Sequence, residues 1–133
     1  MQVVVFSLSN EYFAIKTSIV QGINDMMKVT RVPKAPSHIK GLINLRGNII
    51  SLLDLNLLLN IDEQDDNQNS IVIVDVQDEQ VGIAVDQVDE VFEIDDKSIK
   101  KYDDRNGQPY LKGVINLNNK IITLLDIEKL LEN

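Results

Sequence analysis

Few side chains in this sequence could carry out catalysis, and their types and spacing do not form a catalytic set. His38 is the only histidine, and we interpret it as an aromatic ring packed at the start of a strand. The acidic pairs Asp65-Asp66, Asp95-Asp96 and Asp103-Asp104 lie in polar stretches, where solvated charges are the usual interpretation. The sequence has no G-x-S-x-G nucleophile motif, no phosphate-binding P-loop, no dinucleotide-binding G-x-G-x-x-G and no zinc-binding H-E-x-x-H. It therefore predicts a protein that is not an enzyme and that uses no metal ion or cofactor.

The acidic stretch 62–69 has a composition that resembles a calcium-binding loop. It lacks the glycine at the sixth position and the glutamate at the twelfth that an EF-hand loop requires. We interpret it as a solvated linker, and we interpret the charged stretch 95–108 in the same way.

The overall composition excludes several classes of function. Apolar residues make up 44% and charged residues 26% of the 133 residues, which is usual for a soluble globular domain. The formal net charge of −8 disfavours binding to nucleic acid or to an anionic membrane surface. With no cysteine, no apparent signal peptide and no apolar run long enough to span a bilayer, we expect a cytoplasmic protein without disulfides or membrane insertion.

The elements that position the side chains are organised as an internal repeat. Residues 39–59 (IKGLINLRGNIISLLDLNLLL) and residues 111–131 (LKGVINLNNKIITLLDIEKLL) are identical at 12 of 21 positions. Further upstream, Val3–Leu8 aligns with Ile71–Val76. We therefore expect one domain, residues 1–133, built from two units of about 1–61 and 70–133 that are joined by the linker 62–69. What both units keep is expected to serve folding, and what one unit alone has is a candidate for function.

Each unit is predicted to begin with a β-hairpin, because two β-branched runs flank a polar turn. These runs are Val3–Leu8 and Tyr12–Ile15 in the first unit, and Ile71–Val76 and Val81–Val85 in the second. The segments that follow, Ile19–Ile23 and Val88–Ile94, have apolar residues at mixed spacing, and we predict irregular structure or a short helical turn there.

The repeated block predicts a second hairpin in each unit. Leu42–Leu45 and Ile49–Leu53 flank a tight turn at Arg46-Gly47-Asn48, and the second unit has Asn118-Asn119-Lys120 at this turn. After this hairpin, each unit has an aspartate (Asp54 and Asp126) that we interpret as the N-cap of a short helix.

Differences between the two units point to an interaction surface. Arg46 stands where the second unit has neutral Asn118, so the fold does not require its charge. An arginine on a tight turn suits an interface or a contact between the units, since it can bind a carboxylate bidentately; a solvated turn arginine is the alternative. Val20 and Ile23, with Val88 and Val91 as their counterparts, lie outside the predicted strands and could line a groove, or they could simply pack in the core.

The run from Ile39 to Ile50, followed by Leu52–Leu55, strongly resembles the signature of the CheW-like domain family. The segments Phe6–Leu8, Val81–Val88 and Ile122–Leu131 support this resemblance, which covers essentially the whole chain. Because the chain leaves no room for a kinase core or a receiver domain, we expect a stand-alone member of the family.

The resemblance implies both a fold and a function. The implied fold is mainly β, with two pseudo-symmetric, small, five-stranded β-barrels of SH3/OB-like type, which can exchange strands, and a short C-terminal helix. The implied function is that of a non-enzymatic adaptor at receptor arrays on the inner face of the membrane. Its partners are the cytoplasmic tip of methyl-accepting chemotaxis receptors and the regulatory domain of the histidine kinase CheA.

The resemblance also implies binding residues. In the family the receptor docks in a groove between the barrels, and the matching positions here are Val20, Ile23, Arg46 and Val88. The kinase-binding face is not assigned to residues. Two alternatives remain open: an adaptor of another chemosensory kinase pathway, such as one that controls surface motility, and a double-barrel module that binds another ligand.

Two positions depart from the family pattern. The family often has Glu where this chain has Gly22, and that Glu can pair with the arginine at the position of Arg46. The family usually has Pro where Ser51 stands, which we expect to be a mild change at a strand edge. The first departure leaves Arg46 without a local partner and frees it for a carboxylate on the receptor.

Overall fold

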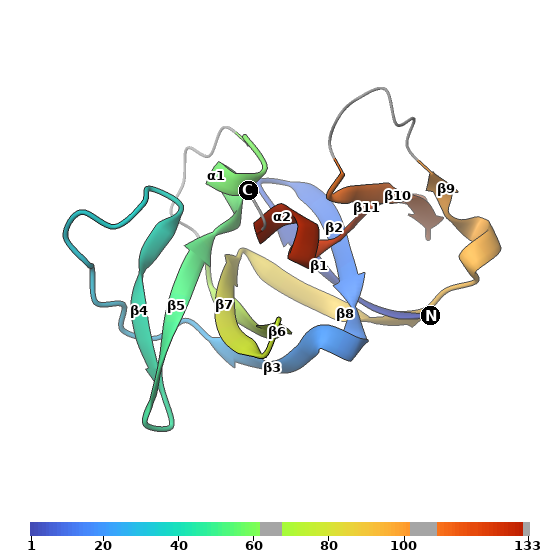
Figure 1. Cartoon of the computed structure of the whole chain (residues 1–133). Coiled ribbons are helices and arrows are strands. Elements are labelled where there is room, and N and C mark those ends of the chain that lie inside the picture. The colour runs from blue at the N-terminus through green and yellow to red at the C-terminus, as the bar shows by residue number, and fades with distance from the viewer. Residues whose placement is uncertain (62–67, 102–108, 132–133) are drawn as a thin grey trace.

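The structure is a computed structural model that describes residues 1–61, 68–101 and 109–131. In these residues the chain forms strands and four short helices (Figure 1). The strands are β1 (Gln2–Leu8), β2 (Glu11–Lys16), β3 (Val20–Asp25), β4 (Ile39–Leu45), β5 (Asn48–Asp54), β6 (Ser70–Val76), β7 (Glu79–Val85), β8 (Gln87–Glu93), β9 (Lys100–Lys101), β10 (Leu111–Leu117) and β11 (Lys120–Leu125). The helices are η1 (Thr17–Ile19), α1 (Leu55–Leu58), η2 (Asp96–Ser98) and α2 (Ile127–Leu131), and each is too short to cross a membrane.

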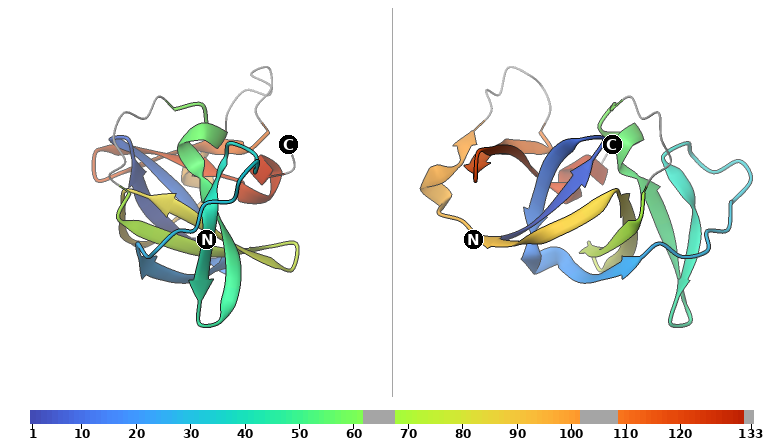
Figure 2. Two further views of the ribbon diagram at one scale, coloured as in Figure 1. Left: turned by 90° about the vertical axis from the view of Figure 1, so that its left-hand side faces the viewer. Right: turned by 180° about the vertical axis from the view of Figure 1, so that it is seen from behind.

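The strands form two sheets, and each sheet contains strands from both repeat units (Figure 2). The six-stranded sheet has the order β8-β1-β2-β11-β10-β9, and the five-stranded sheet has the order β3-β6-β7-β5-β4. The two repeat units meet at four strand pairs: β2 with β11 and β5 with β7 are parallel, whereas β1 with β8 and β3 with β6 are antiparallel, as are the pairs within each unit. The exchange of strands between the two halves, which the family resemblance allows, is therefore present in the structure.

In each sheet, the chain that follows one edge strand (β3 or β8) crosses to the other end of the sheet and forms backbone hydrogen bonds there. After β3, Thr30 forms two backbone hydrogen bonds of 2.8 Å with Leu42 of β4. After β8, β9 pairs with β10 at Gly113. A β-carbon on Gly41 would lie 2.4 Å from the Thr30 carbonyl oxygen, and one on Gly113 would lie 2.6 Å from the Lys100 carbonyl oxygen. Both units keep this glycine because the closing backbone approaches too closely for any side chain.

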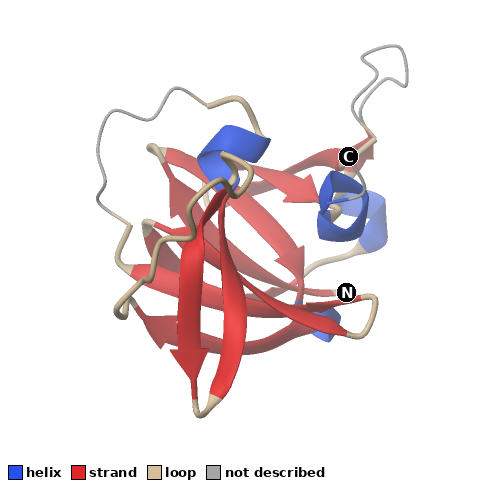
Figure 3. Ribbon diagram, turned by 60° about the vertical axis from the view of Figure 1, so that its left-hand side comes forward, coloured by secondary structure: helices blue, strands red, loops and turns tan. Residues whose placement is uncertain are grey.

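Three groups of buried residues form the interior. The central cluster joins the two sheets and both α-helices, and it comprises Phe6, Leu8, Phe13, Ile15, Leu53, Leu55, Val72, Val74, Val76, Val81, Ile83, Val85, Tyr110, Leu125, Ile127 and Leu130. A second cluster lies within the six-stranded sheet and a third within the five-stranded sheet. Figure 3 shows that strands make up most of this architecture and that the helices are small.

The tight turns of the repeated block are confirmed. Arg46 and Gly47 have φ values of 54° and 87°, and Asn118 and Asn119 have 52° and 65°. Because Leu45 pairs with Asn48 across the first turn, these are two-residue turns with both central residues at positive φ.

The aspartate caps are confirmed as well. The backbone amide of Leu57 donates to Asp54 Oδ1 at 3.4 Å, and that of Lys129 donates to Asp126 Oδ1 at 3.2 Å. Each aspartate also lies about 4 Å from the lysine next to the repeated glycine: Lys40 Nζ is 4.0 Å from Asp54 Oδ2, and Lys112 Nζ is 3.9 Å from Asp126 Oδ2.

The prediction of irregular structure after the first hairpins is wrong. Residues 20–25 and 87–93 are the strands β3 and β8, and only η1 is helical there. Each strand contains a register shift, between Val20 and Gly22 in β3 and opposite Val5 and Phe6 in β8. A bulge adds a residue to one strand and breaks the strict alternation by which a strand is recognised in a sequence.

The two predicted polar loops lie partly outside the described residues. Of the linker 62–69, positions 62–67 are outside, and Gln68 is buried, where its Oε1 accepts a hydrogen bond from Lys40 Nζ. Of the stretch 95–108, positions 102–108 are outside, and the rest is not simply a loop because it contains η2 and the closing strand β9.

Candidate interaction surface

The bulges in β3 and β8 place the predicted groove residues on one face of each sheet. Residues that pair directly across two strands point to the same face. Val20 pairs with Val74 and Ile23 with Val72, and both partners belong to the central cluster. Without the bulge at Gln21, a spacing of three residues would place Val20 and Ile23 on opposite faces.

Strand β8 repeats this arrangement. Val88 pairs with Phe6 and Val91 with Val4, across the corresponding bulge. We call Val20, Ile23, Val88 and Val91 the apolar stripe. The structure therefore brings Val20, Ile23 and Val88 into equivalent positions, together with Val91, which the sequence aligns with Ile23.

The apolar stripe runs from the interior to the surface. Val20 and Val88 are half-buried and pack against the central cluster. Ile23 is 48% exposed and Val91 is 51% exposed. Strand β3 is an edge strand of the five-stranded sheet and β8 an edge strand of the six-stranded sheet, and Val20 and Val88 both pack against the central cluster that joins the two sheets. The stripe thus offers exposed apolar side chains from both repeat units at the junction of the two sheets.

Arg46 does not lie on the same face as the apolar stripe. Its turn approaches β3 at a pocket of about 200 Å³ that Gln21, Gly22 and Gln80 also line. Gly22 pairs with Ile73, whose side chain belongs to the cluster inside the five-stranded sheet. Arg46 therefore lies near the opposite side of the strand that carries Val20 and Ile23.

The surroundings of Arg46 are polar, and no carboxylate of the described residues pairs with it. Gln21 Nε2 donates to Asp75 Oδ2 at 3.2 Å, and Gln80 Nε2 donates to Gln21 Oε1. Arg46 itself makes no ion pair within the described part of the chain. An ion pair between the repeat units through this arginine is thus not formed among the described residues. Beside Gly22 there is open space, because a β-carbon there would meet only Asn24 Oδ1, at 3.7 Å. The side chain of a glutamate at position 22 would occupy this space.

A group of lysines that the sequence analysis did not select lies at the end of β2. Lys16 and Lys112 line a pocket of about 220 Å³ together with Ser18, Ile19 and the first residues of α2. Partial burial and the neighbouring Lys16 lower the pKa of the Lys112 ammonium group, and Asp126 counteracts this only in part. The signal in the sequence was the repeat itself, because Lys16 aligns with Ala84 of the second unit.

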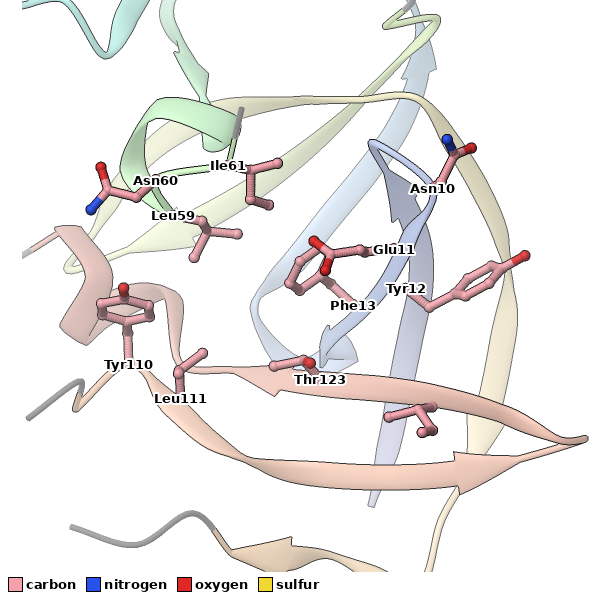
Figure 4. Close-up of a pocket in the computed structure, with 11 residues that line it drawn as sticks. Asn10, Glu11, Tyr12, Phe13, Leu59, Asn60, Ile61, Tyr110, Leu111 and Thr123 are labelled. Carbon is pink, nitrogen blue, oxygen red and sulfur yellow. The ribbon is translucent and has the colours of Figure 1, made fainter. Parts of the chain in front are cut away.

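A pocket of about 660 Å³ lies between the end of α1 and the strands β2 and β11 (Figure 4). Its wall contains apolar side chains such as Phe13, Leu59 and Leu111, and Glu11 is the one acidic residue among the described residues that line it. No group of three or more potential metal-ligating side chains occurs in residues 1–61, 68–101 and 109–131.

His38 lies immediately before β4. Its carbonyl oxygen accepts a hydrogen bond of 2.7 Å from the amide of Asp54, and the Tyr110 carbonyl accepts the equivalent bond of 2.8 Å from Asp126. Histidine and tyrosine therefore occupy matching positions where each helix cap meets the strand that begins the second hairpin. This position fits the structural interpretation of His38.

Comparison with known proteins agrees with this architecture. The family described as the CheW-like domain matches residues 2–133. A relative from Klebsiella aerogenes named Chemotaxis protein CheW is 34% identical over 133 residues, which cover 97% of this chain and 80% of the relative. A relative of the same name from Thermotoga maritima is 29% identical, with 98% and 87% covered. The crystal structure of the scaffolding protein TtCheW from Thermoanaerobacter tengcongensis has a TM-score of 0.86 at 29% identity, with 97% of this chain and 86% of that chain covered.

Proposed function

The chain belongs to the CheW-like domain family of chemotaxis proteins, and on this premise we propose that it is a cytoplasmic adaptor that couples chemoreceptors to the histidine kinase CheA. The observation that carries the proposal is the apolar stripe, in which Ile23 and Val91 remain about half exposed at 48% and 51%. Exposed apolar side chains gathered from two strands are typical of a surface that binds a protein partner.

The proposed receptor contact is a helix lying along the apolar stripe. An amphipathic helix presents an apolar face at a spacing of three to four residues, and such a face covers a shallow apolar surface well. Ile23 and Val91 would be the central contacts, and the half-buried Val20 and Val88 would form the floor beneath them. The chemoreceptor tip, which is a helical structure in this family, is the proposed occupant.

Arg46 is proposed to act at a second point of the same receptor contact. It lies on the far side of β3 and makes no ion pair with a described residue. Its guanidinium group can therefore bind a carboxylate on a receptor that reaches around the strand. The kinase would bind elsewhere on the protein, so that receptor and kinase occupy the adaptor together and no covalent bond is made or broken.

The test is co-elution in size-exclusion chromatography with light scattering. The protein is mixed with the regulatory domain of CheA from the same organism, then with a receptor-tip fragment, and then with both. We expect a complex with each partner alone and a ternary complex with both. The Arg46→Ala variant should still bind the kinase domain and should lose receptor binding. A well-folded protein that binds neither partner contradicts the proposal.

A further inference from the structure

Lys16 and Lys112 form a cationic pair on a protein whose net charge is −8. Lys112 Nζ lies 3.9 Å from Asp126 Oδ2, and Asp126 is the one carboxylate within ion-pair distance of it among the described residues. Asp126 Oδ1 already accepts the hydrogen bond that caps α2. Lys16 makes no ion pair with any described residue. Of the two ammonium groups, only that of Lys112 has a carboxylate within ion-pair distance among the described residues, and Glu128, also at the pocket wall, makes no ion pair there.

In the five-stranded sheet, the lysine that corresponds to Lys112 is Lys40, and it has no second lysine aligned beside it. Lys40 lies 4.0 Å from Asp54 and also donates to Gln68. The residues that align with Lys16 and Lys129 are Ala84 and Leu57, which carry no charge. The five-stranded sheet thus has the same hairpin, helix cap and glycine contact without lysines at the positions that match Lys16 and Lys129. Folding therefore does not require these two lysines.

We propose that Lys16 and Lys112 bind a carboxylate side chain of the helical receptor tip at the end of the apolar stripe. The pocket contains Ile19, and the next residue in the chain is Val20, the first member of the stripe. On this proposal, a helix lying on the stripe passes the pocket, and an aspartate or glutamate at its edge meets both ammonium groups. This inference rests on the proposed function, because it assigns the chemistry of one end of the same contact.

The repulsion within the pair is a reason for it to bind an anion. A partner carboxylate restores the charge balance that Asp126 alone does not provide, and charge-assisted hydrogen bonds of this kind are stronger than neutral ones. Charge complementarity of this type contributes mainly to specificity and to the rate of association. The pair would thus select an acidic helix edge against a neutral or basic one.

The experiment compares the double variant Lys16→Gln, Lys112→Gln with the matched control Lys40→Gln. The affinity of a receptor-tip fragment is measured by isothermal titration calorimetry at low and high salt, and circular dichroism verifies that both variants fold. We expect the double variant to lose about tenfold in affinity at low salt and to become less sensitive to salt. The control should change the affinity by less than about twofold.

A second measurement does not depend on the receptor. The pKa of each lysine is followed by NMR of ¹³C-labelled lysine side chains, with and without citrate as a carboxylate probe. We expect citrate to raise the pKa of Lys112 and to leave that of Lys40 unchanged. If Lys112 does not respond, the anion site is overturned. If the unaltered protein binds the fragment and the double variant binds it equally well, the inference fails while the proposed function stands. If the unaltered protein does not bind the fragment, the proposed function fails, and the receptor as occupant fails with it.

Discussion

Ile23 and Val91 are unusual residues for a strand edge. They are 48% and 51% exposed, although their cross-strand partners Val72 and Val4 are 0% and 2% exposed. Both repeat units keep an apolar residue at this position, where folding gains little from it. A role in binding accounts for this better than a role in the core, since exposed apolar side chains that gather on a surface mark interaction sites.

Ile23→Ala tests this interpretation with little effect on the fold. We expect the affinity for a receptor-tip fragment to fall about fivefold to tenfold, which corresponds to about 1 kcal/mol, because an apolar anchor is lost. Ile49→Ala is the matched control, since Ile49 is 63% exposed but lies on β5, away from the stripe. Calorimetric titration of both variants is the measurement, and an equal loss for both would contradict the assignment of the groove.

Gly22→Glu tests whether Arg46 has an unfilled partner position. Both residues line the same pocket, and a β-carbon on Gly22 would be accommodated. We expect the new carboxylate to pair with Arg46 and the coupling energy between the two positions to be about 0.2–1 kcal/mol, as for other exposed pairs.

The coupling is measured by a double-mutant cycle with Arg46→Ala, using urea unfolding. Gly22→Gln is the control, because it adds the same bulk without the charge. The Gly22→Glu variant should also bind the receptor fragment more weakly than Gly22→Gln does, since Arg46 is then occupied. A coupling energy no larger than that of the Gln variant would contradict the pairing.

Because of Lys112, we expect the free energy of unfolding to change measurably with pH in the alkaline range. Burial and Lys16 lower its pKa in the folded state below the usual value of 10.5. Between the lowered pKa and 10.5 the unfolded chain binds more protons than the folded chain, so the free energy of unfolding should rise with pH in that window. Lys112→Gln should remove this rise. Urea unfolding at a series of pH values measures it, and an identical pH profile for the variant would contradict the prediction.

At the scale of elements, the repeated glycines connect each second hairpin to the segment that closes its sheet. A β-carbon on Gly113 would meet Ile99 Cγ2 and the Lys100 carbonyl oxygen, each at 2.6 Å. Gly113→Ala should therefore push β9 away from β10 and lower the free energy of unfolding by about 2 kcal/mol, as overpacked sites do.

Gly22→Ala is the control for this substitution, because it adds the same methyl group at a position where the nearest atom, Asn24 Oδ1, would be 3.7 Å away. Urea unfolding gives the stability, and amide hydrogen exchange at residues 100–101 shows whether β9 is released. If Gly113→Ala is as stable as Gly22→Ala, then β9 does not restrict the side chain at position 113.

The elements that the sequence predicted well are those with local signals. The two hairpins of each unit were visible because β-branched runs flank residues that adopt positive φ, as Arg46-Gly47 and Asn118-Asn119 do. The aspartate caps were visible because both units keep them. By contrast, β3 and β8 were missed because their bulges interrupt the alternation, and β9 was missed because its two residues are paired only through the fold.

The candidate site was predicted in part for the same reason. Val20, Ile23 and Val88 were selected as apolar residues outside the predicted strands, and the structure places them on equivalent faces. Arg46 was selected by its difference from Asn118, but its location on the other side of β3 depends on which strands are neighbours. Lys16 and Lys112 are 96 positions apart in the sequence, so no local pattern could bring them together.

At the scale of the whole molecule, neither repeat unit contains a complete sheet. Strands β1 and β2 of the first unit pair with β8 and β11 of the second, and β3 and β5 pair with β6 and β7. The fragments 1–61 and 70–133 should therefore lack cooperative thermal unfolding when they are produced separately. When they are mixed, we expect near-native circular dichroism and a cooperative transition. A fragment that unfolds cooperatively by itself would show that one unit suffices.

The exchange of strands also bears on how the protein is made. A ribosome releases the chain from its N-terminus, and the hairpin of β1 and β2 emerges long before β11, with which β2 pairs at Tyr12 and Ala14. During synthesis this apolar hairpin has an unpaired edge, and such edges are prone to aggregate. The five-stranded sheet is complete once β7 has emerged at Val85, so it can fold first and shield the waiting hairpin through the central cluster. Nascent chains stalled before residue 120 should accordingly depend on chaperones more than chains released in full.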